Sequence, residues 1–267
     1  MTAEERSTET LQQPVAARVF GASVIGPLHV RLGLPCQDAC SSFRSLGGES
    51  TVIAVADGLG SAARSELGAR VAADVSCATA GEILDRPGAQ ESLWDVVQAA
   101  AAAARGALEK RAADDGVALR ELATTLIVVA TRGDGLAIAH IGDGAVVAED
   151  GSGLLLVSAP GESEYANEVT PLTSQDWKDS LRIVSLVAGI RSLAVFTDGC
   201  QRAALRKRAT GYEPHEPFFK PIFTYAHKLG SVNDGDAEVR ALLSSPKVSG
   251  NSDDDKTLVV AALQSRV

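Results

Sequence analysis

The 267-residue sequence is poor in aromatic residues and cysteine, and it lacks any long apolar run. Aromatic residues make up 4% of the chain, so its core must be packed mainly from small aliphatic side chains. No run approaches the roughly 20 apolar residues that cross a bilayer. The first thirteen residues are polar and charged, which excludes a signal peptide. We therefore expect no membrane partner and a cytoplasmic location.

The four cysteines are too scattered to form a zinc site. Cys36 and Cys40 have the spacing of half a site, but no matching Cys or His pair completes it. Cys77 and Cys200 stand far from this pair in the sequence. In a cytoplasmic protein, all four are expected to be reduced thiols.

The charge balance is acidic, with a net charge of −9 and a pI near 5.0. This argues against a nucleic-acid partner, because phosphate backbones require a basic face. Arg202, Arg206, Lys207 and Arg208 form a local basic exception. They are expected to close a short helix and bind its last carbonyls. The alternative is that they hold a phosphorylated substrate near Asp198.

The apolar pattern predicts an α+β protein with antiparallel sheets covered by helices. Strands are expected at residues 15–26, 39–46, 51–56, 122–130, 136–141, 145–148, 154–157, 181–187, 192–196 and 257–263. Helices are expected at residues 62–84, 92–112, 199–208, 215–229 and 234–244. Gly-Asp-Gly at 133–135 and at 142–144, and Asp-Gly-Ser-Gly at 150–153, are hairpin signals. We predict one domain over residues 14–267, preceded by a disordered lead-in at residues 1–13.

Aspartates stand at the ends of several expected strands. Asp57 and Asp198 each follow an apolar run, and Asp254 precedes one. A turn explains Asp143 on its own, but neither Asp57 nor Asp198 is followed directly by a partner strand. The run 253–255 places like charges side by side, which a bound cation would relieve. Oxygen ligands without histidine suit Mg²⁺ or Mn²⁺.

Seven short motifs carry a family resemblance. They are QDA (37–39), ADGLGSA (56–62), SELGA (65–69), ATTLIVV (123–129), HIGDGAVV (140–147), FTDG (196–199) and DDKTLVV (254–260). In this order they resemble the protein phosphatase 2C family of metal-dependent serine/threonine phosphatases, in its compact bacterial branch. The resemblance implies a four-layer α-β-β-α sandwich, with two antiparallel sheets flanked by helices.

The resemblance also implies the metal ligands. Asp57 would bridge two Mg²⁺ or Mn²⁺ ions, and the Gly58 carbonyl would bind one of them. Asp198 and Asp254 would complete the shell of the other ion. Asp143, together with Asp198, matches the position of a possible third ion.

The same resemblance implies the chemistry. A hydroxide bridging the two ions would attack the phosphorus of phosphoserine or phosphothreonine. Asp38 would hydrogen-bond a metal-bound water. The implied partners are a phosphoprotein substrate and a cognate kinase, and we expect a monomer.

The sequence departs from the family pattern around the phosphate and the leaving group. The phosphate-binding arginine of many members is absent from its usual place, so Arg31 or His29 would have to serve; otherwise both are exposed strand residues. Leu59 stands where eukaryotic members have a histidine that protonates the leaving group. His140 is expected in the core rather than as a replacement acid.

Two alternatives stay open at this stage. One is a catalytically weak phosphatase-fold module that binds phosphoproteins, although such a module has no need of Asp57, Gly58, Asp198 and Asp254 together. The other is a phosphatase that acts on small phosphoesters, because substrate specificity belongs to the irregular segments of the chain.

Overall fold

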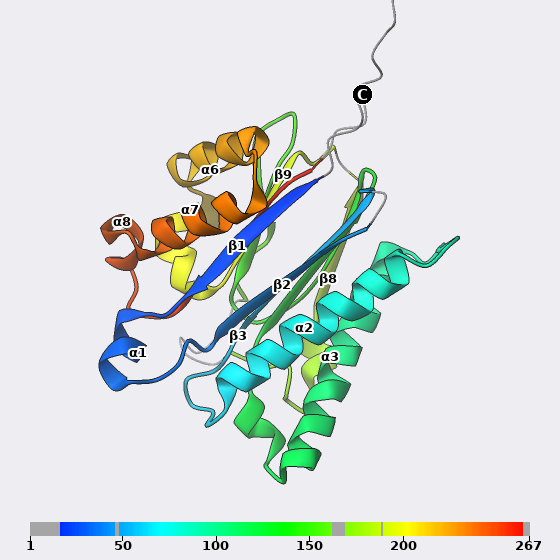
Figure 1. Ribbon diagram of the computed structural model, residues 1–267, viewed down its shortest axis with the longest axis vertical. Helices are drawn as coiled ribbons and strands as arrows, with labels where there is room; N and C mark the ends of the chain where they lie inside the picture. Colours follow the sequence, from blue (N-terminus) through cyan, green and yellow to red (C-terminus); the bar gives the residue numbers. More distant parts are fainter. Residues whose placement is uncertain (1–16, 46–47, 162–168, 188, 264–267) are drawn as a thin grey trace, which may run out of the picture.

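Two five-stranded antiparallel sheets pack face to face between two layers of helices in the computed structural model (Figure 1). The structure describes residues 17–45, 48–161, 169–187 and 189–263, so the expected lead-in at residues 1–13 lies outside them. The first sheet contains, in spatial order, β1 (Arg18–Val24), β12 (Lys256–Ala262), β9 (Ser192–Phe196), β6 (Ala145–Glu149) and β7 (Leu154–Ser158). The second contains β2 (Asp38–Arg44), β3 (Ser50–Asp57), β4 (Leu126–Arg132), β5 (Gly135–Ile141) and β8 (Arg182–Val187).

Each sheet carries its own helical layer. The helices α2 (Ser65–Leu84) and α3 (Leu93–Asp115) cover the second sheet, and α6 (Glu216–Lys228) and α7 (Val232–Ser244) cover the first. Short elements connect the layers. They are α1 (Pro27–Leu32), η1 (Leu119–Leu122), α4 (Trp177–Ser180), η2 (Asp198–Cys200), α5 (Gln201–Ala204), α8 (Pro246–Ser249) and a hairpin of β10 (Leu205–Arg208) with β11 (Gly211–Pro214). The four-layer prediction is therefore confirmed.

The two helical layers use different side chains to pack against their sheets. Seven alanines of α2 and α3 are completely buried, which allows both helices to approach the second sheet closely: Ala69, Ala72, Ala73, Ala80, Ala100, Ala101 and Ala104. Five of the six phenylalanines instead pack between the first sheet and its helices. Branched aliphatic residues such as Ile53, Val129 and Val195 fill the space between the sheets. Small side chains therefore build a large core despite the shortage of aromatic residues.

The second Gly-Asp-Gly signal is not a hairpin. β5 and β6, which flank residues 142–144, belong to different sheets, so this segment crosses from one sheet to the other. The hairpin prediction is correct for the turns at 133–135 and 150–153, whose flanking strands pair. A two-residue Asp-Gly signal describes the local turn but not the sheet that the next strand joins.

Two other local predictions are wrong. The helix expected over residues 199–208 ends at Ala204, and the chain continues as the β10–β11 hairpin. Arg206 does bind a helix carbonyl, that of Arg202 at 3.0 Å, but Lys207 and Arg208 lie exposed on the hairpin. The segment around residue 30 forms α1, so the interpretation of His29 and Arg31 as exposed strand residues is also wrong. Among the described residues, none of the helices has the length and apolar character needed to cross a bilayer.

Close packing of α2 gives a test of this fold. A Cβ added to Gly68 would lie 2.2 Å from the backbone oxygen of Leu122, whereas a Cβ on Gly106 of α3 would meet no atom within 4 Å. We expect Gly68→Ala to lower the free energy of unfolding by about 1–3 kcal/mol, because backbone atoms must move. Gly106→Ala should raise it by roughly 0.5–1 kcal/mol through helix propensity. Denaturant unfolding measures both, and equal effects would contradict the packing described.

Candidate metal centre

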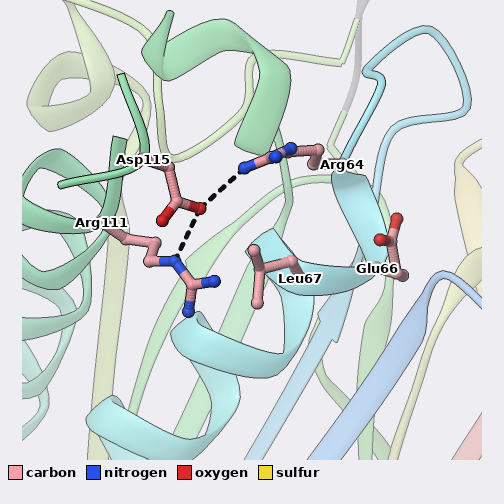
Figure 2. A pocket seen from close by; sticks show the side chains of 5 residues that line it. All are labelled: Arg64, Glu66, Leu67, Arg111 and Asp115. Atoms are coloured by element: carbon pink, nitrogen blue, oxygen red, sulfur yellow. Dashed lines mark hydrogen bonds and ion pairs between the residues drawn. The ribbon is translucent and has the colours of Figure 1, made fainter. Parts of the chain in front are cut away.

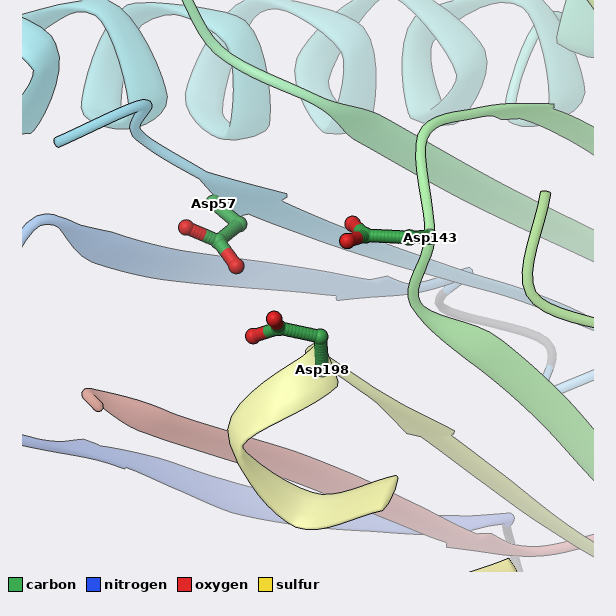
Figure 3. Close-up of side chains that lie close together, drawn as sticks. All are labelled: Asp57, Asp143 and Asp198. Atoms are coloured by element: carbon green, nitrogen blue, oxygen red, sulfur yellow. The ribbon is translucent and has the colours of Figure 1, made fainter. Parts of the chain in front are cut away.

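Three aspartates from separate parts of the chain meet at one end of the sandwich (Figure 3). Asp57 ends β3, Asp143 lies in the crossover between β5 and β6, and Asp198 begins η2 directly after β9. One carboxylate oxygen from each lies within 4.8 Å of the other two, and all three side chains are partly exposed. Both sheets therefore contribute a carboxylate to the same point.

Backbone contacts fix Asp57. Its N–H donates to Thr125 Oγ1 at 3.0 Å, and its carbonyl accepts from the Thr125 N–H at 2.8 Å and from Thr124 Oγ1 at 2.9 Å. The next residue, Gly58, donates its N–H to the carbonyl of Gln37 at 3.0 Å. The end of β3 is thus bound to the residues before β2 and β4, which leaves the Asp57 side chain little positional freedom.

A glycine allows the Asp143 crossover. Gly142 has φ = +121°, and an added Cβ would lie 2.6 Å from Thr125 Cβ. The carbonyl of Asp143 accepts from Gln201 Nε2 at 2.5 Å, so the first residue of α5 contacts the loop of this aspartate. Thr125 therefore packs against two of the three carboxylate-bearing segments.

Asp38 lies beside the three aspartates and is almost completely buried. It is the register partner of Asp57 across β2 and β3. Its Oδ2 accepts from Thr197 Oγ1 and Thr257 Oγ1, both at 2.8 Å. Its buried Oδ1 has no hydrogen-bond partner among the described residues. One oxygen is thus fixed by the first sheet, and the other remains available to a ligand.

Crowding raises the pKa values of these carboxyl groups. Burial, opposed by the hydroxyls of Thr197 and Thr257, raises the pKa of Asp38 to about 8. Burial and then the charges of Asp143 and Asp254 raise the pKa of Asp198 to about 7. Burial and the neighbouring carboxylates, Asp38 first, raise the pKa of Asp57 well above its ordinary value. The pKa of Asp143 is also raised, mainly by burial. Burial first, and like charge after it, therefore disfavours the ionised form of these carboxyl groups when no cation is bound.

The donor set fits a hard divalent cation. All the donors are oxygens, and they cluster without histidine or thiol. A side-chain oxygen of Asp198 is, like Asp38 Oδ1, buried without a hydrogen-bond partner in the described part of the chain. A cation would satisfy such atoms and offset the repulsion between the carboxylates.

Asp254 lies near this cluster but is not part of it. It is exposed on the turn before β12, and its Oδ1 accepts from the Asp255 N–H at 2.9 Å. Its charge nevertheless contributes to the raised pKa values of Asp57, Asp143 and Asp198. The predicted ligand role of Asp254 therefore stays a prediction, as do the roles of the other site residues.

Asp255 holds this part of the site together, and sequence reasoning did not single it out. It is 2% exposed, and its carboxylate accepts from the N–H groups of Gly26 at 2.6 Å and Gln37 at 2.5 Å and contacts His29 Nδ1 at 2.8 Å. His29 is thus buried in a hydrogen bond with Asp255. Arg31 is 59% exposed, with Nη1 3.6 Å from Asp253 Oδ1.

His140 is a core residue, as expected. It is completely buried on β5, with Nδ1 2.7 Å from Ser158 Oγ and in contact with Arg182 Nη2. Burial, and then the charge of Arg182, holds the pKa of His140 well below its usual range. This histidine is therefore neutral and does not replace the acid missing at Leu59.

A separate pocket of about 450 Å³ lies between the start of α2 and the end of α3 (Figure 2). Two guanidinium groups converge there on Asp115 Oδ2, that of Arg64 at 2.7 Å and that of Arg111 at 2.8 Å. Glu66 and Leu67 complete the lining. Arg64 and Arg111 are thus both paired with Asp115, and the pocket contains none of the clustered aspartates.

Comparisons with known proteins agree with this geometry. The family model described as "Protein phosphatase 2C" matches residues 25–244. The "Serine/threonine-protein phosphatase 3" of Escherichia coli (strain K12) is 33% identical over 253 residues, which are 91% of this chain and 97% of that relative. The chain belongs to the protein phosphatase 2C family. The predicted activity class, a serine/threonine protein phosphatase and thus a hydrolase, is confirmed.

Solved structures of bacterial phosphatases share the fold. The catalytic domain of PstP, solved in complex with two manganese ions, is 18% identical and has a TM-score of 0.63, covering 92% of this chain and 98% of that one. Stp1 of Staphylococcus aureus is 14% identical, with a TM-score of 0.62 and coverage of 98% and 100%. At these identities the likeness concerns the fold alone.

The raised pKa values give a stability test. Above pH 4 the folded chain keeps protons that the unfolded chain, with carboxyl pKa values near 3.8, has lost, up to about pH 7 on Asp198 and about pH 8 on Asp38. The free energy of unfolding of the metal-free protein should therefore fall as the pH rises through this window. With chelator present, we expect a lower Tm at pH 8 than at pH 5. Mn²⁺ should raise the Tm more at pH 8, because the cation replaces protons on the same oxygens.

The double variant Asp38→Asn/Asp198→Asn is the control for this experiment. It removes two of the four carboxyl groups with raised pKa values and should make the pH dependence of the Tm in chelator less steep. A wild-type Tm that stays constant or rises between pH 5 and pH 8, or a double variant with an unchanged slope, would contradict the description of the site.

Proposed function

We propose that this chain hydrolyses phosphoserine and phosphothreonine in proteins by means of two Mg²⁺ or Mn²⁺ ions held by its clustered aspartates. The observation that supports this most strongly is the convergence of the Asp57, Asp143 and Asp198 oxygens within 4.8 Å of one another. Asp57 would serve both ions, the Gly58 carbonyl one of them, and Asp198 and Asp254 the other. Asp143 and Asp198 together would hold a third ion.

The protein contributes orientation and charge to this reaction. Bound cations would supply an activated water and stabilise the charge that develops on the phosphoryl group. Asp57 is fixed by Thr125, and Asp38 by Thr197 and Thr257, so their oxygens are positioned before any ligand arrives. The unpartnered Oδ1 of Asp38 is the acceptor that we assign to the reacting water.

Leu59 supplies no proton to the leaving group, and the buried His140 is occupied by Ser158 and Arg182. Turnover should therefore depend on the basicity of the leaving oxygen more strongly than in an enzyme with a positioned acid. Phosphoryl compounds with acidic leaving groups, such as p-nitrophenyl phosphate, are suitable probes of the metal centre alone.

The proposed substrate and partner follow from the family. Phosphoproteins are the substrates that the homology implies, and a kinase that phosphorylates them is the corresponding partner. We propose that residues 14–267 act as one catalytic domain, as a monomer, in the cytoplasm. Size-exclusion chromatography with light scattering tests the monomer, and a stable dimer would contradict it.

Asp57→Asn tests the metal-dependent hydrolysis directly. The substitution removes the proposed bridging charge, so kcat/KM with Mn²⁺ should fall at least about 100-fold on a phosphothreonine peptide and on p-nitrophenyl phosphate. Asp134→Asn is the matched control, because Asp134 belongs to an exposed Asp-Gly turn that asparagine also favours. It should retain wild-type activity.

The same assay separates the alternatives. Wild-type protein with Mn²⁺ that hydrolyses nothing faster than Asp57→Asn would indicate a binding module instead of an enzyme. Hydrolysis of p-nitrophenyl phosphate without hydrolysis of phosphoserine or phosphothreonine peptides would favour small phosphoesters.

Arg31 and His29 are expected to differ in their effect on catalysis. Arg31 is the exposed cation of the two, so Arg31→Ala should raise the KM for a phosphopeptide several-fold and leave the Tm unchanged. Arg86→Ala is its control, since Arg86 is 60% exposed and lies 3.4 Å from Glu91 in a similar surface pair. His29→Ala should lower the Tm, because it removes a hydrogen-bond partner of the buried Asp255 carboxylate. An unchanged KM for Arg31→Ala would remove this residue from the phosphate site.

A further inference from the structure

The short helix α1 reverses the usual distribution of apolar and polar side chains. Five of the nine large apolar residues that are exposed in the described chain lie between residues 25 and 34. They are Ile25 (37% exposed), Leu28 (40%), Val30 (60%), Leu32 (62%) and Leu34 (40%). The buried side chain of the helix is the polar His29. A surface helix ordinarily buries its apolar residues, and contiguous exposed apolar patches mark interaction sites.

Polar contacts hold α1 in place. His29 Nδ1 lies 2.8 Å from Asp255 Oδ2, the Gly26 N–H donates to Asp255 Oδ1 at 2.6 Å, and the Leu28 N–H donates to the carbonyl of Asp253 at 3.0 Å. These bonds fix the backbone of the helix without covering its leucines and valine. Figure 1 shows α1 at one end of the molecule, away from both helical layers. Its exposure is therefore built into the fold.

The same contacts place the apolar residues next to the metal centre. Asp253 and Asp255 flank Asp254, whose charge acts on the clustered aspartates. The Leu28 N–H donates to the carbonyl of Asp253, the residue before Asp254. The exposed apolar residues therefore begin beside the turn that contains Asp254. A polypeptide whose phosphorylated residue reaches the metal centre would therefore pass near the turn that binds α1.

We propose that the exposed apolar side chains of residues 25–34 dock an apolar segment of the substrate protein close to its phosphorylated residue. This inference rests on the function proposed above and narrows its substrate class. The size of the patch favours a short peptide segment over a second copy of the chain. A six-residue helix is about 9 Å long, whereas a stable protein interface uses about 20–30 residues from each partner. The patch suits a weak, transient contact that enters the apparent affinity for substrate.

The test compares two phosphothreonine peptides of equal length and charge. One carries leucine and valine on both sides of the phosphothreonine, and the other carries serine and glycine at the same positions. In the protein, Val30→Ser/Leu32→Ser removes the two most exposed apolar side chains of α1. Val187→Ser is the control, because Val187 is 85% exposed at the end of β8. Steady-state kinetics with Mn²⁺ are measured for both peptides and for p-nitrophenyl phosphate.

We expect the wild type to have a lower KM for the apolar peptide than for the polar peptide. Val30→Ser/Leu32→Ser should raise the KM for the apolar peptide roughly five- to tenfold. The polar peptide, p-nitrophenyl phosphate and the Tm should be unaffected, and Val187→Ser should resemble the wild type.

Three results would overturn the proposal. The first is a wild type that does not distinguish the peptides, or a double variant that keeps the wild-type KM for the apolar peptide. The second is an equal loss on p-nitrophenyl phosphate, which would mean that the variant disturbs the metal centre. The third is a concentration-dependent wild-type dimer in sedimentation that the double variant lacks, which would assign the patch to a second copy.

A failure of the proposed function gives a different result. Wild-type protein would then hydrolyse neither the peptides nor p-nitrophenyl phosphate with Mn²⁺. Fluorescence anisotropy with the unphosphorylated apolar peptide would still report binding to α1 and its loss in Val30→Ser/Leu32→Ser.

Discussion

Repulsion between carboxylates is the constraint on which the site depends. Asp57, Asp143 and Asp198 come from three separate segments, and after burial the charges of Asp143 and Asp198 help to raise the pKa of Asp57. The free energy to hold them together must come from the fold, because the charges alone would separate. The two sheets supply it by packing their apolar faces together, so that the segments leaving their strands meet at one end. A cation would then find the carboxylates already assembled.

Two threonine hydroxyl groups and the buried carboxylate of Asp255 connect the sheets to the site and fix its geometry. Thr197 and Thr257, on the first sheet side, bind Asp38 of the second, and so they join the two sheets at the metal centre. Asp255 performs a similar task for α1 and the residues before β2. Buried charges are costly unless they are paired and hydrogen-bonded, and Asp255 has a partner at each oxygen. We do not propose that Thr197, Thr257 or Asp255 touches substrate, yet their contacts determine where the aspartates of the metal centre lie.

Sequence patterns predicted the parts of this structure that depend on periodicity. Apolar runs located the strands and long helices, because burial on one or both faces imposes a regular spacing. They did not show which sheet a strand joins, so the crossover at Asp143 was mistaken for a hairpin. Asp57 and Asp198 were found because an Asp-Gly after a buried strand without a following partner strand is unusual. Asp255 was missed because its partners, at Gly26, Gln37 and His29, lie more than 200 residues away.

In α1, the local sequence pattern and the long-range contacts favour different structures. Its sequence, PLHVRL, has apolar residues at alternate positions, which locally favours a strand, and the helix forms because Asp255 binds His29 and the Gly26 N–H. These polar contacts fix the helix while its apolar side chains stay exposed, so the fold gains no hydrophobic stabilisation from them. The free energy that the fold does not gain from Val30 and Leu32 is therefore available when another chain covers them. Asp255 is bonded both to His29 of α1 and to Asp254 in the turn before β12. The same residue therefore holds the helix that we propose contacts substrate and the turn beside the metal centre.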